Sequence, residues 1–141
     1  MPAPWRLAAS LIALRALVNG LAPKRDTSSD GSIGDVSHSS RASDHNPDAN
    51  GIVCAIDVTH DPERCNGEGL AEALRHGRDS RVKYVIYNRA MFSSYDHGSI
   101  PAWTWRPYSG SNPHTKHVHI SVLATKADDV SAWRLGGKFA T

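Results

Sequence analysis

An aspartate lies within an apolar run of the chain, and it restricts the folds that the chain can adopt. The run, residues 52–58 (IVCAIDV), has the apolar and β-branched composition of a buried strand. Alternation along this strand places Asp57 on one face with Val53 and Ala55, and the other four residues on the opposite face. A buried carboxylate is costly unless it is paired, hydrogen-bonded or bound to a metal. The fold therefore has to bring partner groups to Asp57.

Histidines are the candidate partners, because the chain has eight and seven of them lie in two windows, residues 38–60 and 97–119. Histidine is the commonest metal ligand in proteins and the usual acid–base group near neutral pH. Residues 118–122 read as another strand, and alternation puts His117, His119 and Ser121 on one side of it.

If the two strands are neighbours, an imidazole and the Asp57 carboxylate converge on one face of a sheet. His45, on the loop that enters the first strand, can supply a third ligand. Two histidines and one carboxylate leave an open fourth position on zinc, which is the arrangement of a catalytic zinc site. Asp48, in the turn between His45 and the strand, is an alternative ligand to Asp57. A His-x-His pair on a strand is also compatible with surface or core histidines.

The remaining elements follow from periodicity and from glycine and proline positions. Leu7, Leu11, Leu14 and Val18 recur at helical spacing, which predicts an amphipathic helix over residues 5–19 that ends at Gly20. The other predicted elements are a loop over 26–51, a helix over 67–76 closed by Gly77, a strand over 82–87, a loop over 88–116 and a short C-terminal element within 126–141. These elements predict a small α+β domain with a short antiparallel sheet.

Composition excludes several classes of protein. Apolar residues make up 40% and charged residues 21% of the 141 residues, as in a folded soluble domain. No run of 18 apolar residues is present, so we expect no membrane insertion. Residues 7–18 resemble the core of a signal peptide, but Arg15 interrupts them, and we interpret them as part of the first helix.

The net charge of +2 is too small to indicate a nucleic-acid partner. Cys54 and Cys65 lack the spacing of a zinc site; they form either a disulfide or two buried thiols.

Two motifs together resemble a known family. Residues 43–57 contain Ser-Asp-His, then Gly51, then Ala-Ile-Asp, and residues 114–119 read His-Thr-Lys-His-Val-His. They are similar to the Ser-x-His…Gly…Ala-x-Asp and His-x-x-His-x-His elements of the zinc D-Ala-D-Ala carboxypeptidases and L-alanyl-D-glutamate peptidases, relatives of the hedgehog signalling domain. Residues 32–62 and 84–122 further resemble small phage endolysin domains.

The resemblance implies a hedgehog-like or D-Ala-D-Ala-peptidase-like fold, with a small antiparallel sheet flanked by helices. It implies one catalytic domain over 1–141, with an N-terminal helix (1–22) packed on it and no separate wall-binding domain. One zinc ion would be held by His45, Asp57 and His119. The implied catalytic residues are His117, His114 and Arg41. Candidate substrate-binding residues are Ser43, Trp105 and Tyr108, although the two aromatic side chains are equally compatible with core or lid packing.

The implied activity is hydrolysis of a peptidoglycan stem peptide by a monomeric endolysin. Such a protein is expected to be made in the host cytoplasm without a signal peptide and to reach the wall after membrane lysis. The scissile bond stays open between L-Ala–D-Glu, D-Ala–diaminopimelate and D-Ala–D-Ala. The other classes considered are a non-catalytic zinc-containing binding or signalling module and a histidine–metal nuclease.

Two departures from the family pattern bear on mechanism. Eleven residues separate His45 from Asp57, where the family usually has six, and the extra residues 46–50 form the predicted turn. Lys116 stands where many family endopeptidases have an acidic base, three residues before the last ligand. A histidine is chemically able to take that role, because its pKa lies near the working pH.

Overall fold

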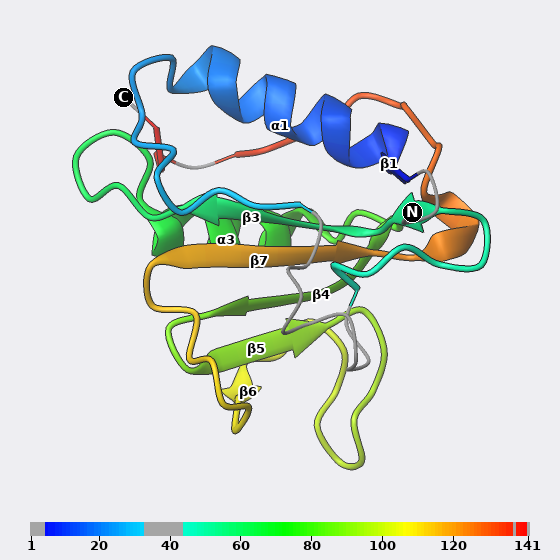
Figure 1. The fold of residues 1–141 in the computed structure, drawn as a ribbon. Helices are drawn as coiled ribbons and strands as arrows, with labels where there is room; N and C mark the ends of the chain where they lie inside the picture. The colour runs from blue at the N-terminus through cyan, green and yellow to red at the C-terminus, as the bar shows by residue number, and fades with distance from the viewer. Residues whose placement is uncertain (1–4, 33–43, 137, 141) are drawn as a thin grey trace.

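The computed structural model describes residues 5–32, 44–136 and 138–140, and its centre is a five-stranded antiparallel sheet (Figure 1). The strands lie in the order β3 (Ala55–Thr59), β7 (His117–Val122), β4 (Val82–Tyr87), β5 (Ala90–Ser93) and β6 (Arg106–Pro107). A short parallel ladder joins β1 (Arg6–Leu7) to β2 (Ile52–Val53) beside this sheet. The α+β prediction is therefore confirmed.

Helix α1 (Ala9–Leu21) runs along the β3 side of the sheet (Figure 1). Its predicted apolar stripe is buried, with Leu11, Leu14 and Val18 all fully inaccessible to solvent. The helix starts later than predicted because residues 6–7 pair with β2, and it continues one residue past Gly20. None of the helices that the described residues form is long and apolar enough to cross a membrane.

Helix α3 (Gly67–Gly77) covers one face of the sheet and lies behind β7 and β4 in Figure 1. The side chain of Asn66 caps its first turn by accepting a hydrogen bond from the Gly69 N–H at 3.0 Å. Its C-terminal end differs slightly from the prediction, because Arg78 adopts the left-handed conformation (φ 48°) that was expected of Gly77.

The predicted strand over 52–58 divides at Cys54. Residues 52–53 pair with β1, whereas residues 55–59 pair with β7, so the two parts belong to different ladders. The Cys54 carbonyl accepts a hydrogen bond from the Val122 N–H at 2.9 Å, which keeps this junction attached to the end of β7. Cys54 and Cys65 are both buried as free thiols.

The predicted loop over 88–116 contains two strands, β5 and β6, that sequence patterns did not indicate. Strand β5 forms a hairpin with β4 through a two-residue turn, Asn88 and Arg89, whose φ angles are 50° and 68°. Positive φ at both central residues is the geometry of a type I′ turn, for which Asn-Gly is the usual signal. This chain has arginine in place of that glycine, so the sequence did not indicate the turn.

Strand register places the candidate site on the face opposite to α3. Asp57 lies across from His119, and His119 lies across from Ile86. Farther along the sheet, Ile86 lies across from Met91, which lies across from Arg106. Because residues directly opposite each other in an antiparallel sheet share a face, these five side chains form one row.

Candidate metal centre

Three side chains converge at the β3–β7 pair. His45 Nε2 lies 3.1 Å from Asp57 Oδ1 and 3.1 Å from His119 Nδ1, and the last two atoms are 3.3 Å apart. Ligand atoms bound to zinc at about 2.0–2.1 Å in tetrahedral geometry are about 3.3 Å from one another. The triad of His45, Asp57 and His119 therefore has the separations of a ligand set and could hold a metal ion.

Hydrogen bonds orient both imidazoles for this task. His45 Nδ1 lies 2.6 Å from the Ser32 carbonyl oxygen, which can only accept, so Nδ1 carries the proton and Nε2 presents a lone pair to the triad. His119 Nε2 lies 2.8 Å from Ser121 Oγ; donation from Nε2 to this hydroxyl leaves the His119 Nδ1 lone pair free. Partners of this kind set the tautomer and ring orientation of histidine ligands.

The Asp57 carboxyl group is held in its ionised form. Burial alone would raise the pKa of Asp57, but the two imidazoles that face the carboxylate, those of His119 and His45, outweigh burial and hold this pKa well below its usual range. A deprotonated carboxylate is the form that binds metal. Gly31 lies against this group, because a Cβ added there would sit 3.3 Å from Asp57 Oδ2.

His117 lies beside the triad on the same strand face as His119, as predicted. Its Nδ1 is 3.0 Å from Ser29 Oγ, and its Nε2 is 3.5 Å from Asp57 Oδ2. This Nε2 atom is buried and has no hydrogen-bond partner among the described residues. Burial lowers the pKa of His117, although the nearby Asp57 charge opposes the shift. His117 thus presents, next to the candidate metal position, a ring nitrogen that makes no hydrogen bond among the described residues.

His114 reaches the same place from the loop before β7. Its ring centre lies 5.2 Å from that of His117 and 5.4 Å from that of His119. Burial, together with these two imidazoles, lowers the pKa of His114 to about 4, so its ring is neutral at neutral pH. Its backbone has φ 55°, a conformation that non-glycine residues rarely adopt, and hydrogen bonds with Asn88 and Asn112 hold it there.

Several contributors to the site were not predicted as functional. Tyr84 of β4 stacks on the His119 ring, with centres 5.4 Å apart and planes 10° from parallel. Lys83 forms an ion pair with Asp44 at 3.1 Å and so attaches the residue before His45 to the sheet. Ser121 had a usable signal, because alternation places it on the His119 face. The other contacts join segments far apart in the chain, and no local pattern indicates them.

Asp48, the alternative ligand, lies in the turn and not in the triad. Its Oδ1 accepts hydrogen bonds from the N–H groups of Asn50 and Ile52, at 2.8 and 3.1 Å. This closes the turn that residues 46–50 were predicted to form. Two candidate site residues, Arg41 and Ser43, lie outside the described residues.

The two predicted substrate-contacting aromatic residues lie on different sides of the sheet. Tyr108 contacts the His114 ring at 5.5 Å between centres, near the triad. Trp105 instead packs edge-on against Phe92 at 5.0 Å and donates its indole N–H to Glu72 on α3. Phe92 projects to the α3 side, since it alternates with Met91. Trp105 is therefore a packing residue of the helix-covered face.

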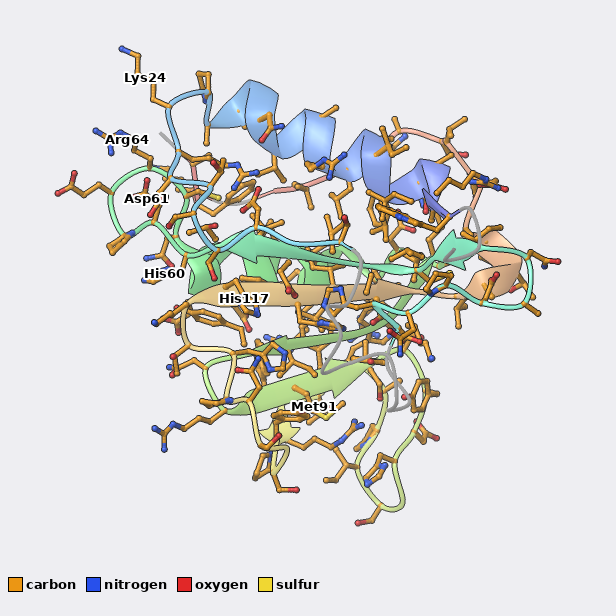
Figure 2. The ribbon with its side chains drawn as sticks, in the orientation of Figure 1. Lys24, His60, Asp61, Arg64, Met91 and His117 are labelled. Carbon is orange, nitrogen blue, oxygen red and sulfur yellow. The ribbon has the colours of Figure 1, made fainter. Side chains whose placement is uncertain are left out.

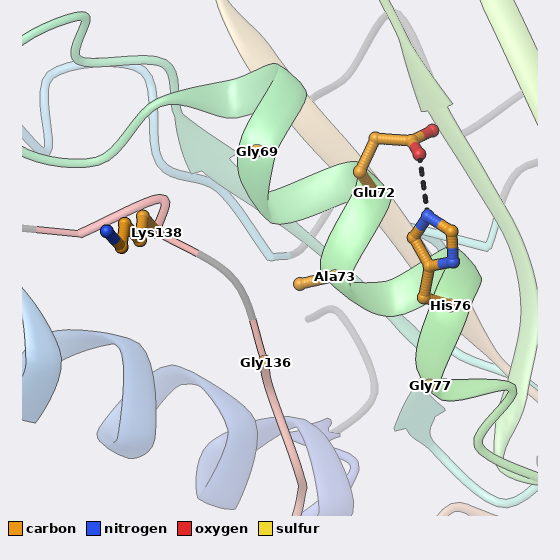
Figure 3. A pocket seen from close by; sticks show the side chains of 7 residues that line it. All are labelled: Gly69, Glu72, Ala73, His76, Gly77, Gly136 and Lys138. Atoms are coloured by element: carbon orange, nitrogen blue, oxygen red, sulfur yellow. Dashed lines mark ion pairs between the residues drawn. The ribbon is translucent and has the colours of Figure 1, made fainter.

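A cavity of about 500 Å³ lies on the outer side of α3 and is lined by Glu72, Ala73, His76 and Lys138, among others (Figure 3). Within it, His76 Nε2 lies 3.2 Å from Glu72 Oε2. Because α3 covers the face opposite to the triad, the sheet separates this cavity from the candidate metal centre.

Comparison with known proteins adds no relative to this description. No protein-family model matches the chain, and no curated protein or solved structure is similar enough to count as a match.

Proposed function

We propose that this protein is a zinc peptidase that hydrolyses a peptide bond in the stem peptide of bacterial peptidoglycan, in the manner of a phage endolysin. The observation that carries the proposal is the triad, in which three ligand atoms lie 3.1–3.3 Å apart beside two further histidines. The substrate class comes from the resemblance of residues 43–57 and 114–119 to the peptidoglycan peptidases.

The donor set fits zinc. Two neutral imidazoles and one carboxylate suit a borderline-soft ion, whereas Mg²⁺ and Ca²⁺ prefer oxygen ligands. Three protein ligands leave a fourth position for water or substrate, as in catalytic sites. A bound zinc ion supplies Lewis acidity, which lowers the pKa of water and polarises a carbonyl group.

The histidines beside the triad supply the proton chemistry. His117 Nε2 accepts a proton from the attacking water and returns it to the leaving amine, while the Ser29 hydroxyl holds the opposite ring nitrogen at 3.0 Å. The neutral His114 ring, whose Nδ1 is buried and unpaired among the described residues, hydrogen-bonds the substrate. A histidine thus takes the role that an acidic residue has in many of the peptidases that the chain resembles, where this chain has Lys116. Arg41 remains a proposed donor to the developing oxyanion.

The primary test is hydrolysis of bacterial cell walls. The zinc-loaded protein is expected to clear a wall suspension, a chelator is expected to stop clearing, and mass spectrometry of the released muropeptides identifies the scissile bond. Bound zinc without any released peptide would refute the peptidase and favour a non-catalytic binding module.

Two substitutions separate metal binding from proton transfer. His119→Ala should abolish both zinc binding and hydrolysis. His117→Ala should retain zinc and lose about 10²- to 10⁴-fold in rate, the usual contribution of a general acid–base group. His76→Ala is the control, because this exposed side chain lies on α3, and it should retain full activity. Full activity of His117→Ala would show that the assigned role is wrong.

A further inference from the structure

A second cavity, of about 420 Å³, opens on the same sheet face as the triad. Met91 and Arg106 line it, and strand register aligns both with His119. Met91 lies on β5, below His117 of β7 in Figure 2. Tyr108 joins the two places, since it lines the cavity and also contacts the His114 ring. The cavity is therefore an extension of the candidate active site.

Arg106 is the unusual member of this cavity. Its side chain is buried, with the residue 8% exposed, and Nη1 donates to Ser93 Oγ at 2.9 Å. Among the described residues, three arginines are buried, and the other two, Arg25 and Arg81, each pair with a carboxylate at 2.7 Å. No carboxylate of the described residues lies within ion-pair distance of Arg106.

A largely buried guanidinium without a carboxylate partner is costly unless water or a ligand satisfies it, and an anionic ligand in the cavity would supply the missing charge. The described cavity lining contains no acidic residue. The guanidinium has five N–H donors in a planar fork, and the bond to Ser93 uses only one of its nitrogens. The geometry of that fork matches a carboxylate.

Tyr108, packed over Gly110, forms one wall of the cavity. The Tyr108 ring folds directly over Gly110, so that a Cβ on residue 110 would overlap the Tyr108 hydroxyl. Glycine at this position allows the tyrosine ring to line the cavity together with Arg106 and to contact the His114 ring.

We infer that this cavity is a substrate subsite in which Arg106 binds a free carboxylate of the peptide being cut. The inference rests on the proposed peptidase function and narrows its substrate to stem peptides whose carboxylate is not amidated. Three strand spacings of about 4.8 Å separate the β6 and β7 backbones. The recognised carboxylate therefore belongs to a residue near the scissile bond and not to the reacting carbonyl.

A stem peptide with L-Lys at its third position carries such a group in two places, at the α-carboxylate of the γ-linked D-Glu and at the C-terminus. The test uses acetyl-L-Ala-γ-D-Glu-L-Lys-D-Ala-D-Ala and two analogues, each with one of these carboxylates converted to a carboxamide. For the zinc-loaded wild type, one amidation should lower kcat/KM by about 10- to 100-fold, the usual effect of losing a charged hydrogen bond. Arg106→Gln should cut the parent peptide and the analogue that lacks the recognised carboxylate at the same, reduced rate.

Arg89→Gln is the matched control, because Arg89 is an exposed arginine of the adjacent hairpin, and it should retain the preference for the carboxylate. The subsite is refuted if neither amidation changes the wild-type rate. It is also refuted if Arg106→Gln lowers the rates for all three peptides by one common factor, which is the result of a purely structural role.

A binding measurement separates this inference from the peptidase proposal. The parent peptide is titrated into chelator-treated protein while the Arg106 Nε–H signal is followed by NMR. The parent should shift the signal, and the sensitive carboxamide analogue should not. A shift without hydrolysis by the zinc-loaded protein would refute the peptidase and keep the subsite, whereas hydrolysis without a shift would refute the subsite alone.

Discussion

The function of the triad depends on which ring nitrogen of each histidine carries its proton. Ser32 settles this for His45, since a backbone carbonyl accepts hydrogen bonds and cannot donate them. Ser121 acts on His119 through a side chain, and a side chain can be removed by substitution. Substitution of Ser121 therefore tests directly how much the hydrogen bond to the second ring nitrogen of a histidine ligand contributes to metal affinity.

Ser121→Ala should weaken zinc binding by about 10- to 100-fold, because the His119 ring loses the partner that sets its orientation. A competition titration against a chromophoric chelator measures the affinity. Ser131→Ala, at an exposed serine bonded to Asp129, is the control and should bind zinc as the wild type does. Unchanged affinity in Ser121→Ala would show that packing against Tyr84 orients His119 without this bond.

Two residues of the triad, Asp57 and His119, were predictable from strand patterns, and His45 from its place in the loop before the first strand. A charged residue in an apolar strand needs a partner, and alternation puts His117 and His119 on one face. The supporting contacts were not predictable, because Ser29 and Ser32 reach the site from more than 80 residues before β7 with no local pattern to indicate it. For Trp105 the sequence left substrate contact and core packing open, and the structure shows it packed against Phe92 and bonded to Glu72.

At the scale of elements, prediction succeeded where periodicity was strong and failed where geometry depended on a turn. The strand over 82–87 and the stripe on α1 were read correctly from apolar spacing. Strand β5 was missed because it has only four residues and follows a turn without glycine. Both Asn88 and Arg89 have positive φ. An asparagine side chain can offset the steric cost of this conformation by a local hydrogen bond, whereas an arginine side chain does not.

Arg89→Gly should therefore stabilise the folded protein by about 0.5–1 kcal/mol, because glycine adopts positive φ without steric cost. The greater freedom of glycine in the unfolded chain offsets part of this gain. Urea unfolding measures the change from the transition midpoint. Arg89→Ala removes the same side chain but keeps a Cβ, so it should give no stabilisation. An equal gain in both variants would assign the effect to the arginine side chain and not to the turn.

At the scale of the whole molecule, the candidate metal centre joins segments that the chain order keeps apart. His45 comes from the loop before β2, Asp57 from β3 and His119 from β7. Asp44 extends the connection to β4 through Lys83. Because the triad exists only when these segments are assembled, the folded state binds the metal far more tightly than the unfolded chain does.

Zinc should consequently raise the unfolding temperature of the protein. A ligand at 1,000 times its Kd stabilises the folded state by about 4 kcal/mol, which corresponds to an increase on the order of 10 °C for a domain of this size. Calorimetry of the chelator-treated protein with and without zinc measures the shift. Mg²⁺ should produce no comparable shift, because two imidazoles disfavour it. His119→Ala should lose the shift, and an equal shift in that variant would place zinc on other histidines and refute the triad as the metal site.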